Sequence, residues 1–247
     1  MNRVKESTQY IESGMFSRHS ERYDDWYERN RFAYQSEIAA LKKVIPSYGR
    51  GLEIGVGTGR FAAALGITVG VDPSHEMLAR ARDKGVCVRW GRGEDLPFLD
   101  CSFDYAAVIV TLVFVEDPLR VLREARRVLK PDGVLIAGII DRDSFLGEYY
   151  RHKRGPFYAQ ADLLTVGQLI SLLCRAGFAV FSRWQTIFDL PEAMTAPQPV
   201  KKGSGAGGFA VVRARKTGKE KCTYGRERRN SNPGRRPGRH GKRGHRA

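Results

Sequence analysis

The sequence has no long apolar run and no patterned set of cysteines. The apolar stretch at residues 106–115, which includes Thr111, is far shorter than the ~20 residues that a membrane-spanning helix needs. The four cysteines form no CxxC pair and have no histidine at ligand spacing, so we expect free thiols and no metal site. The N-terminal residues lack the apolar core of a secretory signal, and we therefore expect a cytoplasmic protein.

Acidic residues are scarce at the C-terminal end, and the charge of the chain is uneven as a result. Residues 213–247 hold 14 Lys and Arg against Glu220 and Glu227, which is +12 of the formal net charge of +15. Beyond Arg215 the apolar periodicity ends, and Gly, Pro and Arg dominate. We predict a disordered basic tail over residues 214–247, because such a composition buries too little apolar surface to fold.

The rest of the chain has the composition of a globular protein, with 42% hydrophobic and 28% charged residues overall. Short apolar segments alternate with amphipathic segments of helical period. The predicted strands are residues 51–54, 68–71, 86–90, 103–110, 134–140, 177–181 and 208–212. The predicted helices cover residues 20–46, 60–65, 117–129 and 163–176, another begins at residue 73, and residues 191–207 are predicted as a loop. This alternation predicts an α/β fold in which helices cover both faces of a mostly parallel sheet.

A glycine-rich segment, Glu53-Ile54-Gly55-Val56-Gly57-Thr58-Gly59, follows the first predicted strand. Glycines adopt positive φ readily and let a ligand approach the backbone closely. The Gly-x-Gly-x-Gly spacing is one residue shorter than the GxGxxG pattern of dinucleotide-binding proteins, and Glu53 would repel a pyrophosphate. S-Adenosylmethionine carries a cationic amine and a sulfonium, so an acidic residue beside the loop favours this cofactor over NAD.

Asp72 ends the second predicted strand, about one βα unit after the glycine loop. Ligands of open α/β sheets bind at the carboxyl ends of the strands, and a carboxylate there can accept hydrogen bonds from both hydroxyls of a ribose. Asp72 before Pro73 and Ser74 would also make a helix N-cap. The nearby glycine loop favours the ribose interpretation.

Five ordered motifs lie at residues 52–59, 71–78, 93–98, 102–104 and 123–133. Together they resemble the class I S-adenosylmethionine-dependent methyltransferases, in particular the UbiE-like "methyltransferase type 11" group. The resemblance extends over residues 23–212 and implies a Rossmann-like, seven-stranded sheet whose last strand, near residues 209–212, is antiparallel. It also implies a cofactor-binding methyltransferase domain at residues 49–213.

The resemblance implies a role for each part of the cofactor site. The glycine loop with Glu53 would hold the methionine moiety, Asp72 the ribose and Met77 the adenine ring, while Gly93-Glu94 would lie at the adenine edge. The full candidate set for cofactor binding is Tyr23, Glu53, Gly55, Gly57, Gly59, Asp72, Pro73, Met77, Gly93, Glu94 and Thr111.

Two positions depart from the pattern of the family. Arg92 stands where relatives often have an acidic residue, and a guanidinium cannot accept a hydrogen bond from the adenine amine. Residues 111–115 replace a stretch that often contains histidine. The catalytic residues therefore stay unknown at this stage.

Aromatic residues precede the first predicted strand at helical spacing. The helical segment at residues 1–48 resembles the lid that such enzymes fold over cofactor and substrate, which makes Tyr23, Tyr27 and Tyr34 candidates for closing the site. The alternative is a stripe that only packs against the core, as aromatics at this spacing usually do.

The favoured function is transfer of a methyl group, by in-line displacement, from S-adenosylmethionine to a small-molecule acceptor. Such a reaction needs alignment and desolvation more than a dedicated base. Two alternatives stay open. One is methylation of RNA or protein, with the basic tail as a nucleic-acid anchor, and it is not favoured because no RNA-binding module is recognisable. The other is a non-catalytic protein that binds S-adenosylmethionine, since fold alone does not establish transfer.

Overall fold

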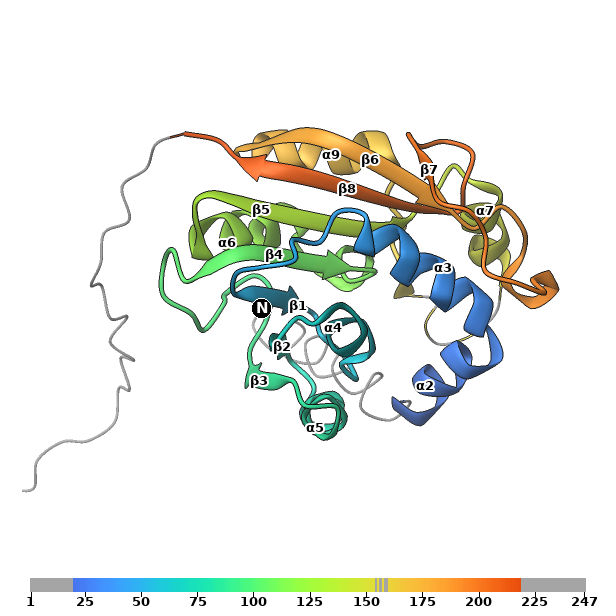
Figure 1. Ribbon diagram of the computed structural model, residues 1–247, viewed down its shortest axis with the longest axis horizontal. Coiled ribbons are helices and arrows are strands. Elements are labelled where there is room, and N and C mark those ends of the chain that lie inside the picture. The colour runs from blue at the N-terminus through green and yellow to red at the C-terminus, as the bar shows by residue number, and fades with distance from the viewer. Residues whose placement is uncertain (1–19, 154, 156, 158–159, 219–247) are drawn as a thin grey trace, which may run out of the picture.

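The computed structural model describes residues 20–153, 155, 157 and 160–218, which form one mixed sheet flanked by helices (Figure 1). The strands are β1 (Gly51–Ile54), β2 (Val69–Asp72), β3 (Cys87–Trp90), β4 (Phe103–Ile109), β5 (Leu129–Ile140), β6 (Phe178–Thr186), β7 (Lys201–Lys202) and β8 (Phe209–Lys216). The α-helices are α2 (Ser20–Arg29), α3 (Arg31–Lys42), α4 (Arg60–Leu65), α5 (His75–Asp83), α6 (Pro118–Val128), α7 (Phe145–His152) and α9 (Val166–Arg175). Short 3-10 helices lie at η1 (Leu112–Phe114) and η2 (Pro191–Ala193).

The sheet has the order β3-β2-β1-β4-β5-β8-β6-β7. Strands β3, β2, β1, β4 and β5 are parallel to one another, and β8 is antiparallel to both β5 and β6. The α/β class, the mostly parallel sheet and the antiparallel last strand are therefore confirmed. The described residues form eight strands rather than seven, because Lys201 and Lys202 pair with Gln185 and Trp184 on the outer side of β6. The Gln185 side chain holds this segment by accepting hydrogen bonds from two backbone N–H groups further along it, at 2.9 and 2.8 Å.

Helices cover both faces of the sheet, as predicted. Along β4, Tyr105, Ala107 and Ile109 face a core that includes residues of α3, α4 and α5. The alternate residues Ala106 and Val108 face a second core with α6 and α9. Figure 1 shows α3 and α4 in front of the sheet and α6 and α9 behind it. This arrangement leaves the carboxyl ends of the parallel strands free to carry a site.

Side chains at the helix N-termini explain where the helices begin. The Asp117 carboxylate accepts a hydrogen bond from the Arg120 N–H at 3.0 Å, and Pro118 occupies the first turn of α6. Helix α9 begins with a capping box, in which Thr165 and Gln168 each accept a backbone hydrogen bond from the other at 3.0 Å.

The N-terminal segment is two helices rather than the continuous helix expected over residues 20–46. Asn30 separates α2 from α3, with φ −109° and ψ 41°, and its side-chain amide donates to the Trp26 carbonyl at 2.8 Å. Asn favours such local bonds with the backbone over helical geometry. The break changes the direction of the chain between the two helices.

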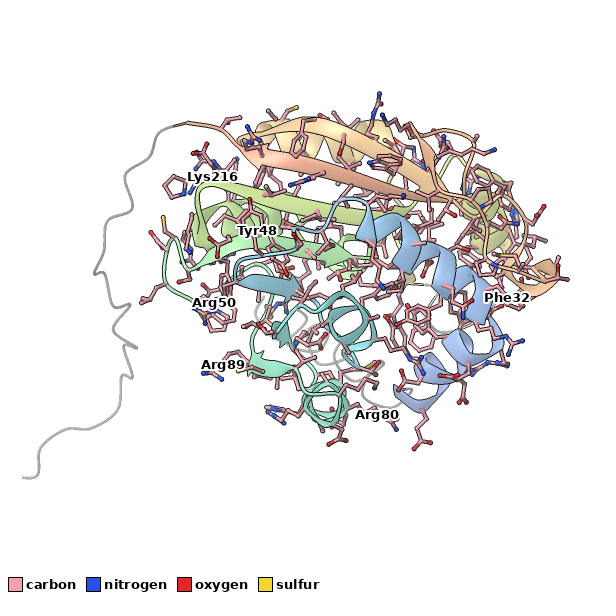
Figure 2. All side chains as sticks on the ribbon, in the orientation of Figure 1. Phe32, Tyr48, Arg50, Arg80, Arg89 and Lys216 are labelled. Carbon is pink, nitrogen blue, oxygen red and sulfur yellow. The ribbon has the colours of Figure 1, made fainter. Side chains whose placement is uncertain are left out.

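The last strand, β8, extends to Lys216, three residues past the domain end predicted at residue 213 (Figure 2). The Lys216 side chain is buried, and its ammonium donates to the Leu129 carbonyl at 2.9 Å. Most of the predicted basic tail, residues 219–247, lies outside the described residues.

Two remaining expectations concern the cysteines and the membrane. Cys87 and Cys174 are free thiols, whereas Cys101 is in a disulfide, so the expectation of free thiols is wrong at that position. The spacing of cysteines along a chain does not fix which of them meet in space. Over the part of the chain that the structure describes, none of the helices is long and apolar enough to cross a membrane.

Candidate active site

The glycine loop between β1 and α4 has the backbone geometry that its sequence predicts. Gly55, Gly57 and Gly59 have φ values of 72°, 51° and 78°, in the left-handed region that favours glycine. A Cβ atom on Gly55 would lie 2.3 Å from the Thr111 Cγ2 atom, so the loop packs directly on the segment that follows β4. A Cβ atom on Gly57 would instead meet nothing nearer than the Tyr23 ring, at 3.9 Å. The space in front of Gly57 is therefore open to a ligand.

Asp72, at the carboxyl end of β2, is tied to this loop. Its Oδ2 atom accepts a hydrogen bond from the Gly57 N–H at 2.9 Å, and its Oδ1 atom accepts one from the Ser74 N–H at 2.9 Å. The N-cap of α5 is Ser74, which accepts from the Met77 N–H at 3.2 Å, so Asp72 is not needed for that task. Burial raises the pKa of the Asp72 carboxyl to about 6, and the two backbone hydrogen bonds limit the rise.

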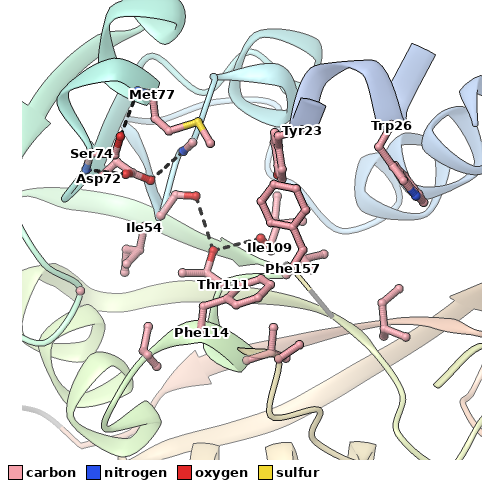
Figure 3. Close-up of a pocket in the computed structure, with 18 of the residues that line it drawn as sticks. Tyr23, Trp26, Ile54, Asp72, Ser74, Met77, Ile109, Thr111, Phe114 and Phe157 are labelled. Atoms are coloured by element: carbon pink, nitrogen blue, oxygen red, sulfur yellow. Dashed lines mark hydrogen bonds between the residues drawn. The ribbon is translucent and has the colours of Figure 1, made fainter. Parts of the chain in front are cut away.

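A cavity of about 1030 Å³ opens over the carboxyl ends of the parallel strands. Figure 3 shows Asp72 and Met77 on one wall, Tyr23 and Trp26 from α2 on the opposite wall, and Thr111 between them. The sequence-predicted residues that line the cavity are Tyr23, Gly55, Gly57, Asp72, Pro73, Met77, Gly93, Glu94 and Thr111. Segments distant in sequence thus meet at one site, at the edge of the sheet where strand order reverses.

The structure places Glu53 and Gly59 behind the loop rather than on the cavity wall. Gly59 is the N-cap residue of α4, and a Cβ atom there would lie 2.9 Å from the Ala81 backbone. The Glu53 side chain is buried, and the Ala62 N–H donates to its carboxyl group. Burial raises the pKa of Glu53 well above its usual range, and its Oε2 atom has no hydrogen-bond partner among the described residues. Direct contact of Glu53 with the methionine moiety stays a prediction.

Arg92, which departs from the family pattern, is part of a charged cluster at the predicted adenine end. Its guanidinium lies 3.5 Å from a Glu94 carboxylate oxygen and 3.4 Å from one of Glu116. The Glu94 Oε1 atom also accepts a hydrogen bond from the Glu116 N–H at 3.2 Å. Glu94 is therefore held on the cavity wall by these contacts, with Met77 nearby as a buried apolar surface.

The aromatic residues of the N-terminal helices both pack and line the cavity. The Tyr23 and Tyr27 hydroxyls are hydrogen-bonded at 3.0 Å, and the Tyr23 ring makes an edge contact with Phe157 at a centroid distance of 6.0 Å. Tyr34 does not line the cavity; its hydroxyl donates to the Arg60 carbonyl at 2.9 Å, and its ring packs on Phe61. The lid role is therefore supported for Tyr23 and Tyr27 by their position, and it stays a prediction.

Asp24 fastens α2 to the helix that follows the glycine loop. Its Oδ1 atom accepts hydrogen bonds from Thr58 Oγ1 at 2.7 Å and from Arg60 Nε at 2.6 Å. Arg80 and Lys84 of the α5 region approach its other carboxylate oxygen at 3.6 and 3.8 Å. Helix α2 and the glycine loop are thus joined by one partly buried carboxylate.

We expect Asp24→Ala to weaken the binding of S-adenosylhomocysteine roughly 5- to 30-fold, because charge-assisted hydrogen bonds of about 1–2 kcal/mol no longer hold α2 over the loop. Calorimetric titration measures this change, and hydrogen exchange should show faster exchange in α2. The neighbouring exposed residue supplies the control, Asp25→Ala, which should leave both unchanged. Equal effects of the two substitutions would contradict the role of Asp24.

Sequence reasoning missed several residues of the cavity wall, among them Trp26, Asn30 and Glu37. Glu37 had a detectable signal, because it is a charged residue among Ala33, Ala40 and Leu41 on the apolar face of α3. Its side chain is only 3% exposed, and its Oε2 atom has no hydrogen-bond partner among the described residues. Trp26 of α2 and Asn30, which follows that helix, come from a segment whose position over the cavity depends on tertiary packing.

Known proteins similar to this chain agree with the geometry. Residues 52–137 match the sequence profile of a family described as a methyltransferase domain. A crystal structure from Thermotoga maritima, named as a SAM-dependent methyltransferase and possible histamine N-methyltransferase, is 46% identical; the match covers 83% of this chain and 99% of that chain, with a TM-score of 0.80. An uncharacterised protein of Methanocaldococcus jannaschii is 46% identical over 82% of this chain and 98% of its own length. The ubiquinone/menaquinone biosynthesis C-methyltransferase UbiE of Rickettsia typhi is 27% identical over 66% of this chain and 73% of its own length.

The chain belongs to the class I S-adenosylmethionine-dependent methyltransferases, and S-adenosylmethionine is its cofactor. The residues of the cavity suit that molecule. The space in front of Gly57, which a Cβ atom would fill, lets a ligand approach the loop backbone, and Asp72 presents a carboxylate beside it.

The pKa of Asp72 leads to a prediction for cofactor binding. Only the ionised carboxylate offers both oxygens as strong acceptors to ribose hydroxyls, so affinity for S-adenosylhomocysteine should fall as the pH drops through about 6. Calorimetric titrations with S-adenosylhomocysteine between about pH 5 and pH 8 test this expectation. In Asp72→Asn, which cannot ionise, affinity should be lower and this pH dependence should be absent.

Proposed function

We propose that the protein transfers the methyl group of S-adenosylmethionine to a small-molecule acceptor bound beside the cofactor, under α2 and α3. The observation that most supports this proposal is the extent of the cavity, which continues from the glycine loop to Tyr27, Glu37 and Tyr150. Its volume of about 1030 Å³ is just above the ~300–1000 Å³ typical of a site for one small ligand. A cavity of this size supports the proposal that a cofactor and a small acceptor bind in it together.

The residues around the cavity contribute mainly position and exclusion of water. Bound S-adenosylmethionine would supply a methyl carbon that its sulfonium already activates. The backbone at Gly55 and Gly57 and the Asp72 carboxylate would hold the cofactor, while Tyr23 and Phe157, whose rings make an edge contact, would limit the access of water to it. Alignment of two bound reactants and their desolvation are large contributions to such a displacement.

An amine is one candidate among the small acceptors. The Thermotoga maritima relative is named as a possible histamine N-methyltransferase, and its high identity over most of both chains supports testing amines here. The cytoplasm as the place of the reaction stays a prediction from the sequence.

Methylation of RNA or protein is the alternative function. The basic segment motivates it, and residues 219–247 of that segment lie outside the described part of the chain. Incubation of the protein with methyl-labelled S-adenosylmethionine and either a metabolite extract or total RNA and protein separates the two. Label in small molecules that persists when residues 219–247 are deleted supports our proposal, and label only in macromolecules overturns it. Binding of S-adenosylhomocysteine without transfer to any fraction would indicate a non-catalytic protein.

A further inference from the structure

Glu37 presents a buried carboxyl group to the cavity and is not among the predicted cofactor contacts. The side chain comes from the middle of α3 and is 3% exposed, yet it lines the cavity. Its Oε2 atom makes no hydrogen bond among the described residues. A buried carboxyl oxygen without a partner is unfavourable, so a group that only stabilised the fold would be expected to be bonded.

The surroundings of Glu37 are aromatic. Tyr27 and Tyr23 of α2 and Tyr150 of α7 line the same cavity, together with Phe157. Aromatic faces beside a carboxylate are the environment that recognises an organic ammonium ion, through charge pairing and cation–π attraction.

Three basic side chains of the cavity wall pair with acids other than Glu37. The pairs are Arg92 with Glu94 and Glu116, Lys153 with Glu192, and Arg151 with Glu148. These three cations thus have acidic partners, whereas the Glu37 Oε2 atom has no hydrogen-bond partner among the described residues. A cationic ligand would complete the pairing.

We propose that Glu37 binds the amine nitrogen of the methyl acceptor and removes a proton from it, so that the acceptor is a small amine with an apolar or aromatic body. This inference rests on the proposed function, because it concerns the acceptor of that transfer. Glu37 takes a proton from the ammonium form, which frees the nitrogen lone pair. The nitrogen then forms a bond to the methyl carbon as the carbon–sulfur bond breaks with its electron pair staying on sulfur, and the proton on Glu37 passes to water as the protonated methylamine leaves.

The protonation of Glu37 suits this role. Burial raises the pKa of its carboxyl to about 8, close enough to that of an amine for a proton to pass between them. The titratable groups that interact with it are Tyr23, Tyr27 and Tyr34, and burial raises the pKa of each of these hydroxyls. Burial also raises the pKa of Glu53, the other buried carboxyl that interacts with Tyr23 and Tyr34. Affinity for an ammonium ion should therefore rise as the pH increases to about 8 and level off above it.

The test uses the full chain and a metabolite extract separated on a cation exchanger into retained and unretained fractions. Each fraction is incubated with methyl-labelled S-adenosylmethionine, and the labelled product is examined for an N-methyl group. The acceptor isolated in this way is then titrated calorimetrically into protein saturated with S-adenosylhomocysteine, a complex that cannot react. Wild type is compared with Glu37→Gln, which keeps the shape of the side chain, and with Asp83→Asn, which removes an exposed acid at the end of α5 that does not line the cavity.

We expect the acceptor in the retained fraction and N-methylation of the product. Glu37→Gln should lose at least ~100-fold in kcat/KM and ~10-fold or more in acceptor affinity. The rise in acceptor affinity between lower pH and about pH 8 should be absent from this variant. The affinity of Glu37→Gln for S-adenosylhomocysteine should stay within about twofold of wild type, which also shows that the variant is folded. If Glu37→Gln does not fold, two other variants are compared. Glu37→Asp, which keeps the charge, is expected to bind the acceptor better than Glu37→Ala. Asp83→Asn should behave as wild type.

Two results would overturn the inference while leaving the proposed function in place. One is an acceptor found only in the unretained fraction, and the other is a Glu37→Gln variant with unchanged acceptor affinity and kcat/KM. Absence of label from every small-molecule fraction, with S-adenosylhomocysteine still bound, would instead overturn the proposed function itself.

Discussion

Substitution of Gly55 by alanine is expected to reduce the affinity for S-adenosylhomocysteine at least ~100-fold. The new Cβ atom would lie 2.3 Å from Thr111 Cγ2 and 2.5 Å from its hydroxyl oxygen, so either the loop or the segment after β4 must move. Gly55 also has φ 72°, where an alanine costs about 1–2 kcal/mol. Displacement of the loop would carry Gly57 away from Asp72 and disturb the wall that both residues form.

Gly66→Ala is a matched control, because it separates the clash from the backbone strain. Gly66 has φ 70°, almost the same as Gly55, but a Cβ atom there would meet nothing within 4 Å. Both variants should lose about 1–2 kcal/mol of unfolding free energy from the left-handed backbone, as measured by chemical denaturation. Only Gly55→Ala should lose cofactor affinity by calorimetry. If the two variants bound S-adenosylhomocysteine equally well, the tight packing of the loop on Thr111 would have no functional role.

Asp72→Ala is expected to weaken S-adenosylhomocysteine binding by at least ~100-fold. The substitution removes the acceptor of two backbone hydrogen bonds, from Gly57 and Ser74, and the carboxylate that would receive the ribose hydroxyls. Hydrogen bonds to a charged group contribute about 1.5–3 kcal/mol each. The loss of the two hydrogen bonds expected from the ribose hydroxyls therefore corresponds to a change in affinity of at least ~100-fold.

The control for Asp72→Ala is Asp143→Ala, which removes a largely exposed carboxylate from the loop after β5. We expect that variant to bind S-adenosylhomocysteine as wild type does. Thermal unfolding of both variants shows whether the loss of affinity reflects the site or the fold. An Asp72→Ala variant that kept its affinity would show that the ribose interpretation is wrong.

The sequence was sufficient to bring most of the predicted cofactor-binding residues to one place, because their signals are local. Each signal is recognisable within a few residues: three glycines at fixed spacing, and an acidic residue at the end of the next strand. The alternation of strands and helices then places these residues at one edge of the sheet. Gly55, Gly57 and Asp72 accordingly line one cavity. The same local reasoning placed Glu53 beside the loop but could not give the direction of its side chain, which the fold turns toward the first turn of α4.

The acceptor side could not be derived in the same way, because it is assembled from separate segments. Glu37 lines the cavity only because Asn30 breaks the N-terminal segment and α3 then packs against α4, β6 and β8. Helical periodicity over residues 20–46 gave no signal for the break, and Tyr34 at favourable spacing faces Phe61 instead of the cavity. The pairing of Lys201 and Lys202 with β6 was missed for a related reason, since two residues are too few to show a strand pattern.

The position of β8 also has a consequence for the order in which the chain becomes structured during synthesis. Strand β6 pairs with β8 and β7 rather than with a parallel strand, because β8 lies between it and β5 in the sheet order. The ribosome completes β6 well before β8, so β6 must wait for the last described residues before it can join the sheet. Lys216, near the end of those residues, then adds its buried hydrogen bond to Leu129. Chains cut off before residue 209 should therefore leave the edges of β5 and β6 unpaired and be prone to aggregation.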